Sequence, residues 1–246
     1  MTALRGRVVA ITGASRGLGR QAARDLVAAG TMVALLARGS ENLTAAAAEL
    51  GDSAAAFPAD IGDAGSAAAA IDAAALRFGR LDALINNAGL YHPIRVDKSP
   101  TALIERHLTT NLLGAIWCVR AAIPHLRAAG GGDIVNISSL AARTPRPLLS
   151  VYAATKGGLE SFSTGLRNEL RKDRIRVTVL RVGSMAGGSG GLGVDPEVRA
   201  EFLEGVAATG GAWGAPVRPA SLSRILMDIL ALPADVSVNL VDARPI

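Results

Sequence analysis

Tyr152 and Lys156 lie four residues apart in a stretch whose pattern predicts a helix over residues 150–172. Residues at i and i+4 share one face of a helix, so the phenol and the ammonium should lie side by side. A nearby ammonium favours the phenolate and lowers the pKa of a phenol from its usual value of about 10. Such a tyrosine is suited to general acid/base catalysis. Because the same pair is common on protein surfaces, its meaning depends on the residues around it.

Ser139 ends a predicted strand, 13 residues before Tyr152. We expect its hydroxyl to reach the same edge of the sheet as the phenol. The neighbouring Ser138 competes for this role, and we favour Ser139.

A glycine-rich turn, Thr12 to Gly19, follows the predicted strand Val8–Ile11 and opens a predicted helix. Glycines at such a turn let the backbone approach a pyrophosphate at a helix N-terminus. The spacing is GxxxGxG and not the common GxGxxG, and a tight turn without a ligand is the alternative. The residues we expect to bind a dinucleotide here are Gly13, Ser15, Arg16, Gly17, Leu18 and Gly19.

Arg38 follows the predicted strand Met32–Ala37, 19 residues after Gly19. An NAD site usually has an acidic residue at about this place, where it binds the ribose 2′-hydroxyl. A guanidinium instead suits a 2′-phosphate, and Arg16 offers a second one. The sequence therefore favours NADP over NAD, the alternative being two solvated arginines.

Short apolar runs alternate with helical patterns along the whole chain. This alternation predicts a single α/β domain over residues 1–246, of the Rossmann-type doubly wound class, with about seven parallel strands and helices on both faces. The predicted strands cover residues 8–11, 32–37, 54–57, 81–85, 133–138, 175–180 and 236–241. The predicted helices cover residues 18–29, 40–50, 64–78, 150–172, 220–230 and a long one towards Leu126, capped by Ser99 with Pro100 as its first residue. Little regular structure is expected between Gly183 and Gly193.

Composition excludes several classes of protein. Half of the 246 residues are hydrophobic and 19% are charged, which excludes a disordered chain. One cysteine, Cys118, excludes an internal disulfide and is expected to be a small buried side chain, and the three histidines lie at no metal-ligand spacing. We therefore expect no bound metal.

A formal charge of +5 and a pI of about 10.1 raise the question of nucleic acid. The positive charges are spread along the chain, and 3% aromatic residues are too few for a base-stacking platform. We expect no nucleic-acid binding. Since the sequence has neither a membrane-spanning run nor a signal peptide, we expect no membrane association and a cytoplasmic location.

Taken together, these motifs resemble the short-chain dehydrogenase/reductase family over nearly the whole chain. The matching residues, in the family's order, are Thr12, Gly13, Gly17, Gly19, Asp60, Asn86-Asn87-Ala88-Gly89, Asn111, Ser139, Tyr152 and Lys156. The resemblance implies an oxidoreductase that passes a hydride between a nicotinamide and a carbonyl or secondary alcohol.

The resemblance also implies roles for single residues. Tyr152 would exchange a proton with the carbonyl oxygen, Ser139 would bind that oxygen, and Lys156 would bind the nicotinamide ribose and lower the pKa of Tyr152. Asn111 would interrupt the long helix and support a proton relay through water to Lys156. The remaining implied cofactor contacts are Asp60 at the adenine, the adjacent Ile61, and Asn87, Ala88 and Gly89 beyond the fourth strand.

The chain departs from the family pattern after the sixth strand, where Val182 replaces a proline and Gly187 replaces a threonine. This puts the grip on the cofactor in doubt, although Met185 can still contact the nicotinamide amide through its backbone. We expect residues 184–216 to form a lid over the substrate.

The sequence leaves the substrate open between a general ketone or aldehyde and a 3-oxoacyl thioester. Leucines 140, 148, 149 and 192 and Trp213 predict an apolar pocket, while Arg143 and Arg146 offer contacts to an anionic carrier. Tyr91 and His92 are expected to be pocket wall. A cofactor-binding sensor without turnover is the alternative of another class. The resemblance further implies a homotetramer or homodimer through the helices at 101–126 and 150–172.

Overall fold

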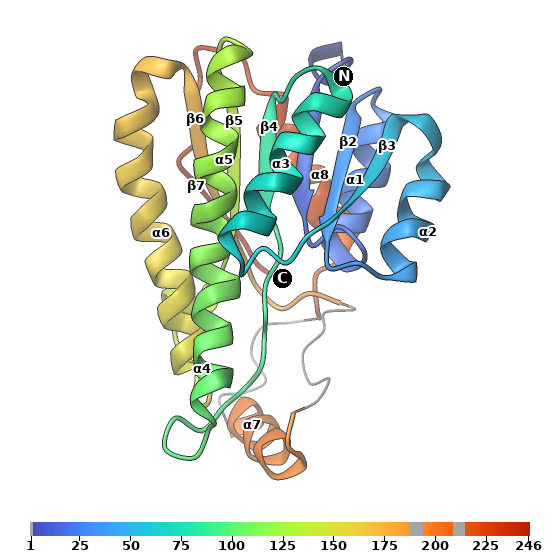
Figure 1. The fold of residues 1–246 in the computed structure, drawn as a ribbon. Helices are drawn as coiled ribbons and strands as arrows, with labels where there is room; N and C mark the ends of the chain where they lie inside the picture. Colours follow the sequence, from blue (N-terminus) through green and yellow to red (C-terminus); the bar gives the residue numbers. More distant parts are fainter. Residues whose placement is uncertain (1, 187–193, 209–214) are drawn as a thin grey trace.

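The computed structural model describes residues 2–186, 194–208 and 215–246. Within these residues seven strands form one parallel sheet in the order β3-β2-β1-β4-β5-β6-β7 (Figure 1). The strands are β1 Val8–Thr12, β2 Met32–Ala37, β3 Ala54–Pro58, β4 Ala83–Asn86, β5 Gly132–Ser139, β6 Ile175–Val182 and β7 Leu240–Ala243. The predicted parallel sheet with flanking helices is confirmed.

Helices cover both faces of the sheet. They are α1 Gly17–Ala28, α2 Glu41–Leu50, α3 Ala64–Phe78, α4 Thr101–Leu108, α5 Gly114–Ala128, α6 Ser150–Leu170, α7 Pro196–Ala208 and α8 Pro219–Leu230. Short 3₁₀ turns cover Thr2–Leu4, Gly51–Ser53, Leu140–Ala142 and Arg171–Asp173. One core cluster joins α1, α2 and α8 to the sheet, and a second joins α3, α5 and α6 to the opposite face. Strands covered on both faces are nearly continuous apolar runs, as the buried residues Val8, Val9, Ala10 and Ile11 of β1 show.

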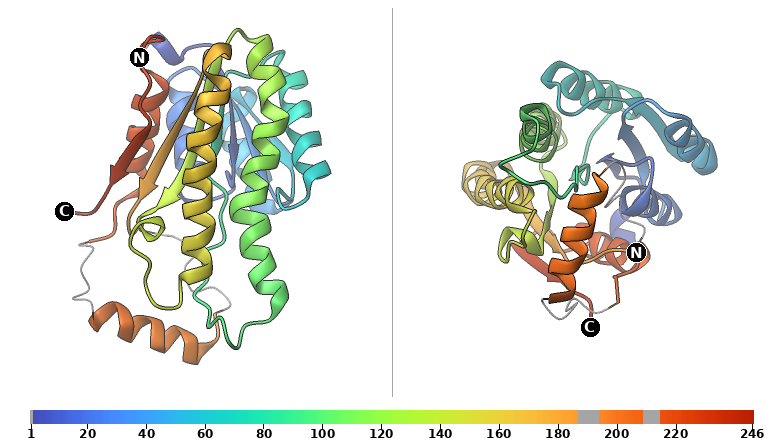
Figure 2. Two further views of the ribbon diagram at one scale, coloured as in Figure 1. Left: turned by 90° about the vertical axis from the view of Figure 1, so that its left-hand side faces the viewer. Right: turned by 90° about the horizontal axis from the view of Figure 1, so that it is seen from below.

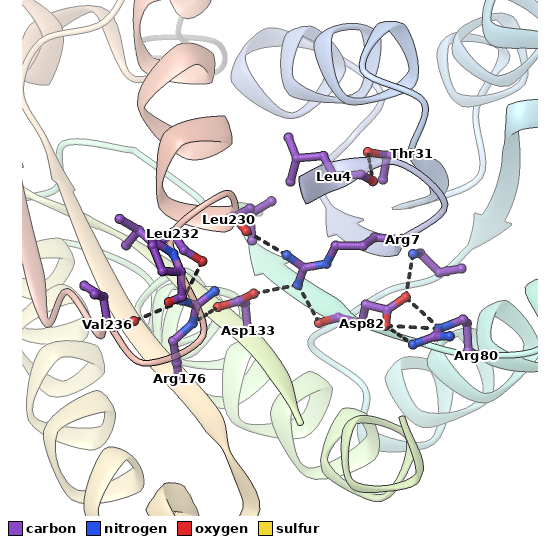
Figure 3. A network of polar contacts seen from close by, with 12 residues as sticks. Leu4, Arg7, Thr31, Arg80, Asp82, Asp133, Arg176, Leu230, Leu232 and Val236 are labelled. Atoms are coloured by element: carbon purple, nitrogen blue, oxygen red, sulfur yellow. Dashed lines mark hydrogen bonds and ion pairs between the residues drawn. The ribbon is translucent and has the colours of Figure 1, made fainter. Parts of the chain in front are cut away.

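A polar network ties together the amino-terminal ends of the four central strands (Figure 3). The carboxylate of Asp133 on β5 accepts from Arg7 before β1 and from Arg176 on β6, each at 2.6 Å. Arg7 also donates to the carbonyl of Asp82 before β4 and, at 2.7 Å, to the carbonyl of Leu230 at the end of α8. Charge-assisted bonds of this kind fix the register at one end of the sheet and leave the other end to carry a site.

Helix α7 lies across the carboxyl end of the sheet, as the two views of Figure 2 and Figure 1 agree. It falls within the expected lid, but the sequence analysis did not predict a helix there. Its polar and apolar residues follow no clear stripe, and no residue of the helix is fully buried. The expectation of little regular structure concerned residues 183–193, of which 187–193 lie outside the described residues.

Two further expectations are wrong in detail. Helix α4 begins at Thr101, so Pro100 occupies the N-cap position, and no side chain caps the helix. The last strand is Leu240–Ala243 and not residues 236–241, because only residues 240–243 pair with β6, while Val236 and Val238 give their carbonyls to the side chains of Arg176 and Thr178.

Candidate active site

Two adjoining cavities open at the carboxyl ends of the strands. The large cleft, about 1050 Å³, runs over the loops that follow β1 to β4. The small pocket, about 480 Å³, lies beside the ends of β5 and β6 and under α7. Leu18, Asn87, Gly89, Tyr91 and Met185 line both, so the two cavities are continuous.

Most of the residues predicted to bind a cofactor meet in the large cleft. They are Gly13, Ser15, Arg16, Gly17, Leu18, Arg38, Asp60, Ile61, Asn87, Ala88, Gly89 and Met185. Gly19 does not line it, because it is buried beneath the turn, where a Cβ would lie 2.5 Å from the carbonyl oxygen of Gly13. The role of Gly19 is therefore close packing of the turn against the chain.

The glycine-rich turn presents a helix N-terminus to the large cleft. Gly13 and Gly17 have φ values of +68° and +56°, which glycine adopts without steric cost. No side chain caps the N-terminus of helix α1, which leaves its first N–H groups available to a ligand. Since Gly17 and Leu18 line the large cleft, these N–H groups suit the diphosphate of a dinucleotide.

Thr12, the last residue of β1, fastens this turn to the end of β4. Its hydroxyl oxygen accepts from the backbone N–H groups of Asn87 and Ala88, both at 3.0 Å. The side chain of Asn87 donates in return to the carbonyl of Thr12 at 2.9 Å. A buried threonine at the end of an apolar strand was the sequence signal for this positioning role.

Arg16 and Arg38 are exposed at one end of the large cleft, and Asp60 is exposed on its rim. Neither arginine forms an ion pair with any residue that the structure describes. The carboxylate of Asp60 accepts from the backbone N–H of Gly62 at 2.9 Å, which turns the chain after β3.

Tyr152 lies in the small pocket, where its side chain is buried and Ser139 lines the same wall. Burial raises the pKa of Tyr152 to about 12, and the nearby Ser139 side chain opposes this shift. Ser139 closes β5 and accepts from the N–H of Ala141 at 3.2 Å, which holds its hydroxyl at the mouth of the pocket. The structure thus brings together Ser139 and Tyr152, as the sequence analysis expected.

Lys156 is also buried, and its ammonium donates to the carbonyl oxygen of Ile137 at 2.8 Å. Burial lowers the pKa of Lys156 to about 8. The expectation that Lys156 lowers the pKa of Tyr152 is wrong for this structure. The ammonium lies 6.0 Å from the centroid of the phenol ring, and the cost of burying a phenolate dominates at Tyr152.

Asn111 interrupts the long helix, as the resemblance implies, within a π-helical turn over Thr109–Leu113. Its side chain is buried and forms hydrogen bonds with both the N–H and the carbonyl of Leu90. The carboxamide oxygen accepts from the Leu90 N–H at 2.6 Å, and the nitrogen donates to the Leu90 carbonyl at 2.9 Å. A longer bond of 3.3 Å reaches the hydroxyl of Thr155 on α6. These contacts place Asn111 between the loop after β4 and the helix that carries Tyr152.

Ser138 and Ser139 point to opposite faces of β5, as successive strand residues must. The hydroxyl of Ser138 donates to Glu160 of α6 at 2.7 Å, and Glu160 pairs with Arg181 of β6. Ser138 therefore belongs to a polar contact between α6 and the sheet, whereas Ser139 contacts Tyr152.

The walls of the small pocket are largely apolar. Leu140 and Leu149 line it as expected, and α7 adds Phe202, Leu203 and Val206. Leu148 does not line it but adopts a left-handed conformation with a φ of +64°. Leu192 and Trp213 lie outside the described residues.

Arg146 is half-buried on the pocket wall, and Arg143 is exposed in the same loop. His92 lines the large cleft, while Tyr91 lines both cavities. Cys118 is buried in α5, and burial raises the pKa of its thiol to about 12, as expected of a packing side chain.

Val182 ends β6 at the pocket, and the chain then pairs with the segment before α8. The N–H of Val217 donates to the carbonyl of Ser184 and the N–H of Ala186 to the carbonyl of Val217, at 2.9 and 3.0 Å. This bridge uses no backbone group of Met185, which lines both cavities. Gly187 lies outside the described residues.

A family model described as short chain dehydrogenase matches residues 7–190. The chain belongs to the short-chain dehydrogenase/reductase family. It is accordingly an NAD(P)-dependent oxidoreductase.

Relatives of this short-chain dehydrogenase/reductase agree in fold and class. The human 3-oxoacyl-[acyl-carrier-protein] reductase is 34% identical over 177 residues, which are 72% of this chain and 75% of that protein. The structure of a Brucella melitensis 3-ketoacyl-(acyl-carrier-protein) reductase complexed with NADH has a TM-score of 0.84 and 29% identity, covering 97% of each chain. A metagenomic short-chain oxidoreductase in complex with NADP has a TM-score of 0.81 and 27% identity, covering 99% of each chain.

In the part of this chain that the structure describes, no helix is both long and apolar enough to cross a bilayer. Sequence analysis missed Phe202 as a contributor to the site, because it did not predict α7. The prediction that Tyr91 is pocket wall is confirmed, and the structure adds the packing of its ring against the ring of Tyr152.

Proposed function

We propose that this enzyme is an NADP-dependent ketone or aldehyde reductase. The observation that carries the proposal is that Tyr152, Ser139 and Lys156 line one small pocket, which is continuous with the large cleft that holds the predicted cofactor residues. A carbonyl substrate in the small pocket would face both side chains, and a nicotinamide in the large cleft would lie beside it.

The residues present suit the dinucleotide. Gly17 and Leu18 at the uncapped start of α1 would bind the diphosphate, and Asn87 to Gly89 would line the nicotinamide half of the cleft. NADPH supplies the hydride when bound. The backbone groups of Met185, which the bridge to Val217 does not use, would serve the nicotinamide amide.

Arg16 and Arg38 support NADP over NAD. Both guanidinium groups are exposed at the end of the cleft that follows β1 and β2, and neither is neutralised by a carboxylate of the described residues. A 2′-phosphate would gain charge-assisted hydrogen bonds there.

The raised pKa of Tyr152 suits the acid in the reduction. With a pKa of about 12, the phenol keeps its proton at neutral pH and can donate it to the carbonyl oxygen as the hydride arrives. The Ser139 hydroxyl would bind the same oxygen, and the Lys156 ammonium, one helical turn along α6, would contact the cofactor ribose. Asn111 would keep Leu90 and Thr155 in register around them and support the return of a proton through water.

A 3-oxoacyl thioester reductase is the second candidate. The human and Brucella melitensis relatives carry this name, and Arg146 on the pocket wall offers a cation to an anionic carrier.

We also propose a homodimer or homotetramer that uses α4 to α6, and a cytoplasmic location.

The test is NADPH consumption by the wild type and by Tyr152→Phe across ketones, aldehydes, quinones and 3-oxoacyl thioesters, with NADH in parallel. Turnover by the wild type alone, with NADPH preferred, supports the proposal, and the substrate class decides between the two candidates. NADPH binding without turnover of any substrate would instead support a sensor that binds the cofactor.

A further inference from the structure

The loop after β4 is attached at two points beside the small pocket. Asn111 binds both backbone groups of Leu90 in this loop. Four residues along, the N–H of Ile94 donates to the carbonyl of Leu148 at 2.8 Å, and Leu148 carries the strained φ noted above. Because both anchors are short hydrogen bonds to partly or fully buried groups, the residues between them have little freedom.

Tyr91 lies between these anchors and projects its ring into the pocket. The ring packs edge-on against Tyr152, with centroids 5.1 Å apart and an interplanar angle of 84°. It packs in the same way against Phe202 of α7, at 6.3 Å and 74°. Edge-to-face pairs at these distances are attractive beyond the area that they bury. Tyr91 therefore joins α7 to the proposed acid, and Phe202 also packs against the cluster of Ala141, Leu149, Tyr152 and Ala153.

A second contact joins α7 to the same loop. Arg95 forms an ion pair with Glu201, the neighbour of Phe202, at 3.2 Å. The pair is exposed and contributes little energy by itself. It is a second contact between the loop after β4 and α7, which lies over the carboxyl end of the sheet (Figures 1 and 2).

We propose that Tyr91 is a positioning residue that holds the phenol of Tyr152 in place and keeps water from it, and that α7 acts on Tyr152 through the contact between Tyr91 and Phe202. The proposal goes beyond the reductase function, and its test by enzyme activity rests on that function. A second test, the ionisation of Tyr152, is independent of it. This ionisation can be measured directly because the sequence has two tyrosines, Tyr91 and Tyr152.

Tyrosinate absorbance in Tyr91→Phe and Tyr91→Ala reports Tyr152 alone, while Ser139 and Lys156, the polar groups nearest its phenol, stay in place. At about pH 10.5 a phenol with an ordinary pKa is about three-quarters ionised, and one with a pKa of about 12 is about 3% ionised. We expect Tyr91→Phe, which keeps the ring, to stay near the lower figure. Tyr91→Ala should raise the ionised fraction at least fivefold, and adding Phe202→Ala to Tyr91→Phe should raise it too.

Circular dichroism at the same pH shows whether each variant is folded, and Tyr91→Leu takes the place of Tyr91→Ala if the latter unfolds. Phe78→Ala is the matched control, since it removes a ring from an edge-on pair with Phe57 outside both cavities. Made together with Tyr91→Phe, it should leave the ionised fraction of Tyr152 unchanged. Equal ionised fractions in folded Tyr91→Phe and Tyr91→Ala would overturn the proposal.

In turnover assays Tyr91→Ala should lower kcat at least tenfold with less change in KM for the substrate, and Tyr91→Phe should keep most of the wild-type kcat. A wild type without any turnover would defeat the reductase function and leave the absorbance result to decide the role of Tyr91. An active wild type with full kcat in Tyr91→Ala would overturn the positioning role alone. Absorbance that responds to Tyr91→Ala but not to the Phe202 change would overturn the coupling to α7.

Discussion

Replacing Lys156 by methionine will change how the stability of this oxidoreductase depends on pH. The Lys156 side chain is almost fully buried, and the structure gives its ammonium one hydrogen bond, to the Ile137 carbonyl, and no carboxylate partner among the described residues. Burial lowers its pKa from 10.5 to about 8. The folded protein therefore bears the cost of a buried ammonium at neutral pH.

The sign follows from proton linkage. Between about pH 8 and 10.5 the unfolded chain binds more protons at this side chain than the folded protein, so the stability of the wild type rises with pH through this window. At about 1.4 kcal/mol per pKa unit, the cost of the buried ammonium is about 3 kcal/mol at pH 7, about 2 at pH 9 and about 1 at pH 10. The Ile137 carbonyl loses its donor in the variant, which costs about 1–3 kcal/mol at every pH. Only the first of these two effects varies with pH.

Urea unfolding of the wild type and Lys156→Met at pH 7, 8, 9 and 10 measures this difference. We expect the stability of the wild type relative to the variant to rise by about 2 kcal/mol from pH 7 to pH 10. Lys172→Met is the matched control, because Lys172 is exposed and its ammonium is solvated in both states. A difference between wild type and Lys156→Met that stays flat with pH, or one that Lys172→Met reproduces, would refute the reasoning.

Three further outcomes are expected. Asp133→Ala leaves two partly buried arginines, Arg7 and Arg176, without their carboxylate and should lower the free energy of unfolding by about 3–5 kcal/mol, measured by thermal unfolding. Asp228→Ala is the control, because both side chains of its ion pair are 61% exposed, and it should lower that free energy by at most about 0.5 kcal/mol. Equal losses in the two variants would contradict the role of the strand-end network. Arg38→Asp should lower the NADPH/NADH affinity ratio about 10- to 100-fold, since a charge-assisted bond contributes about 1.5–3 kcal/mol, and an unchanged ratio in fluorescence titration would exclude the 2′-phosphate contact. Light scattering should give about 50 or 100 kDa, two or four times the 25.1 kDa of the chain, and a mass near 25.1 kDa would exclude the oligomer.

Much of the fold followed from local chemistry. The strands that became β1 and β2 are continuous apolar runs, which only a sheet covered on both faces can bury. The alternation of such runs with helical patterns then leaves a parallel sheet as the consistent solution. Boundaries were less secure where the signal was tertiary. β7 was placed four residues early, because which of its residues pair depends on the carboxyl end of β6 and not on its own sequence.

The sequence by itself determined which residues we propose for the chemistry, since Ser139, Tyr152 and Lys156 are singled out by their type and spacing. Only the tertiary structure decided their electrostatics. An i, i+4 spacing predicts an ammonium that lowers the pKa of the phenol. Burial of both side chains instead raises the pKa of Tyr152 and lowers the pKa of Lys156, because it favours the neutral form of each group. In the same way, Tyr91 and Phe202 lie 111 residues apart in the chain. Their rings meet because the loop after β4 leaves the sheet at the carboxyl edge that α7 covers. Burial and long-range contact depend on the whole packed molecule, and no local pattern contains them.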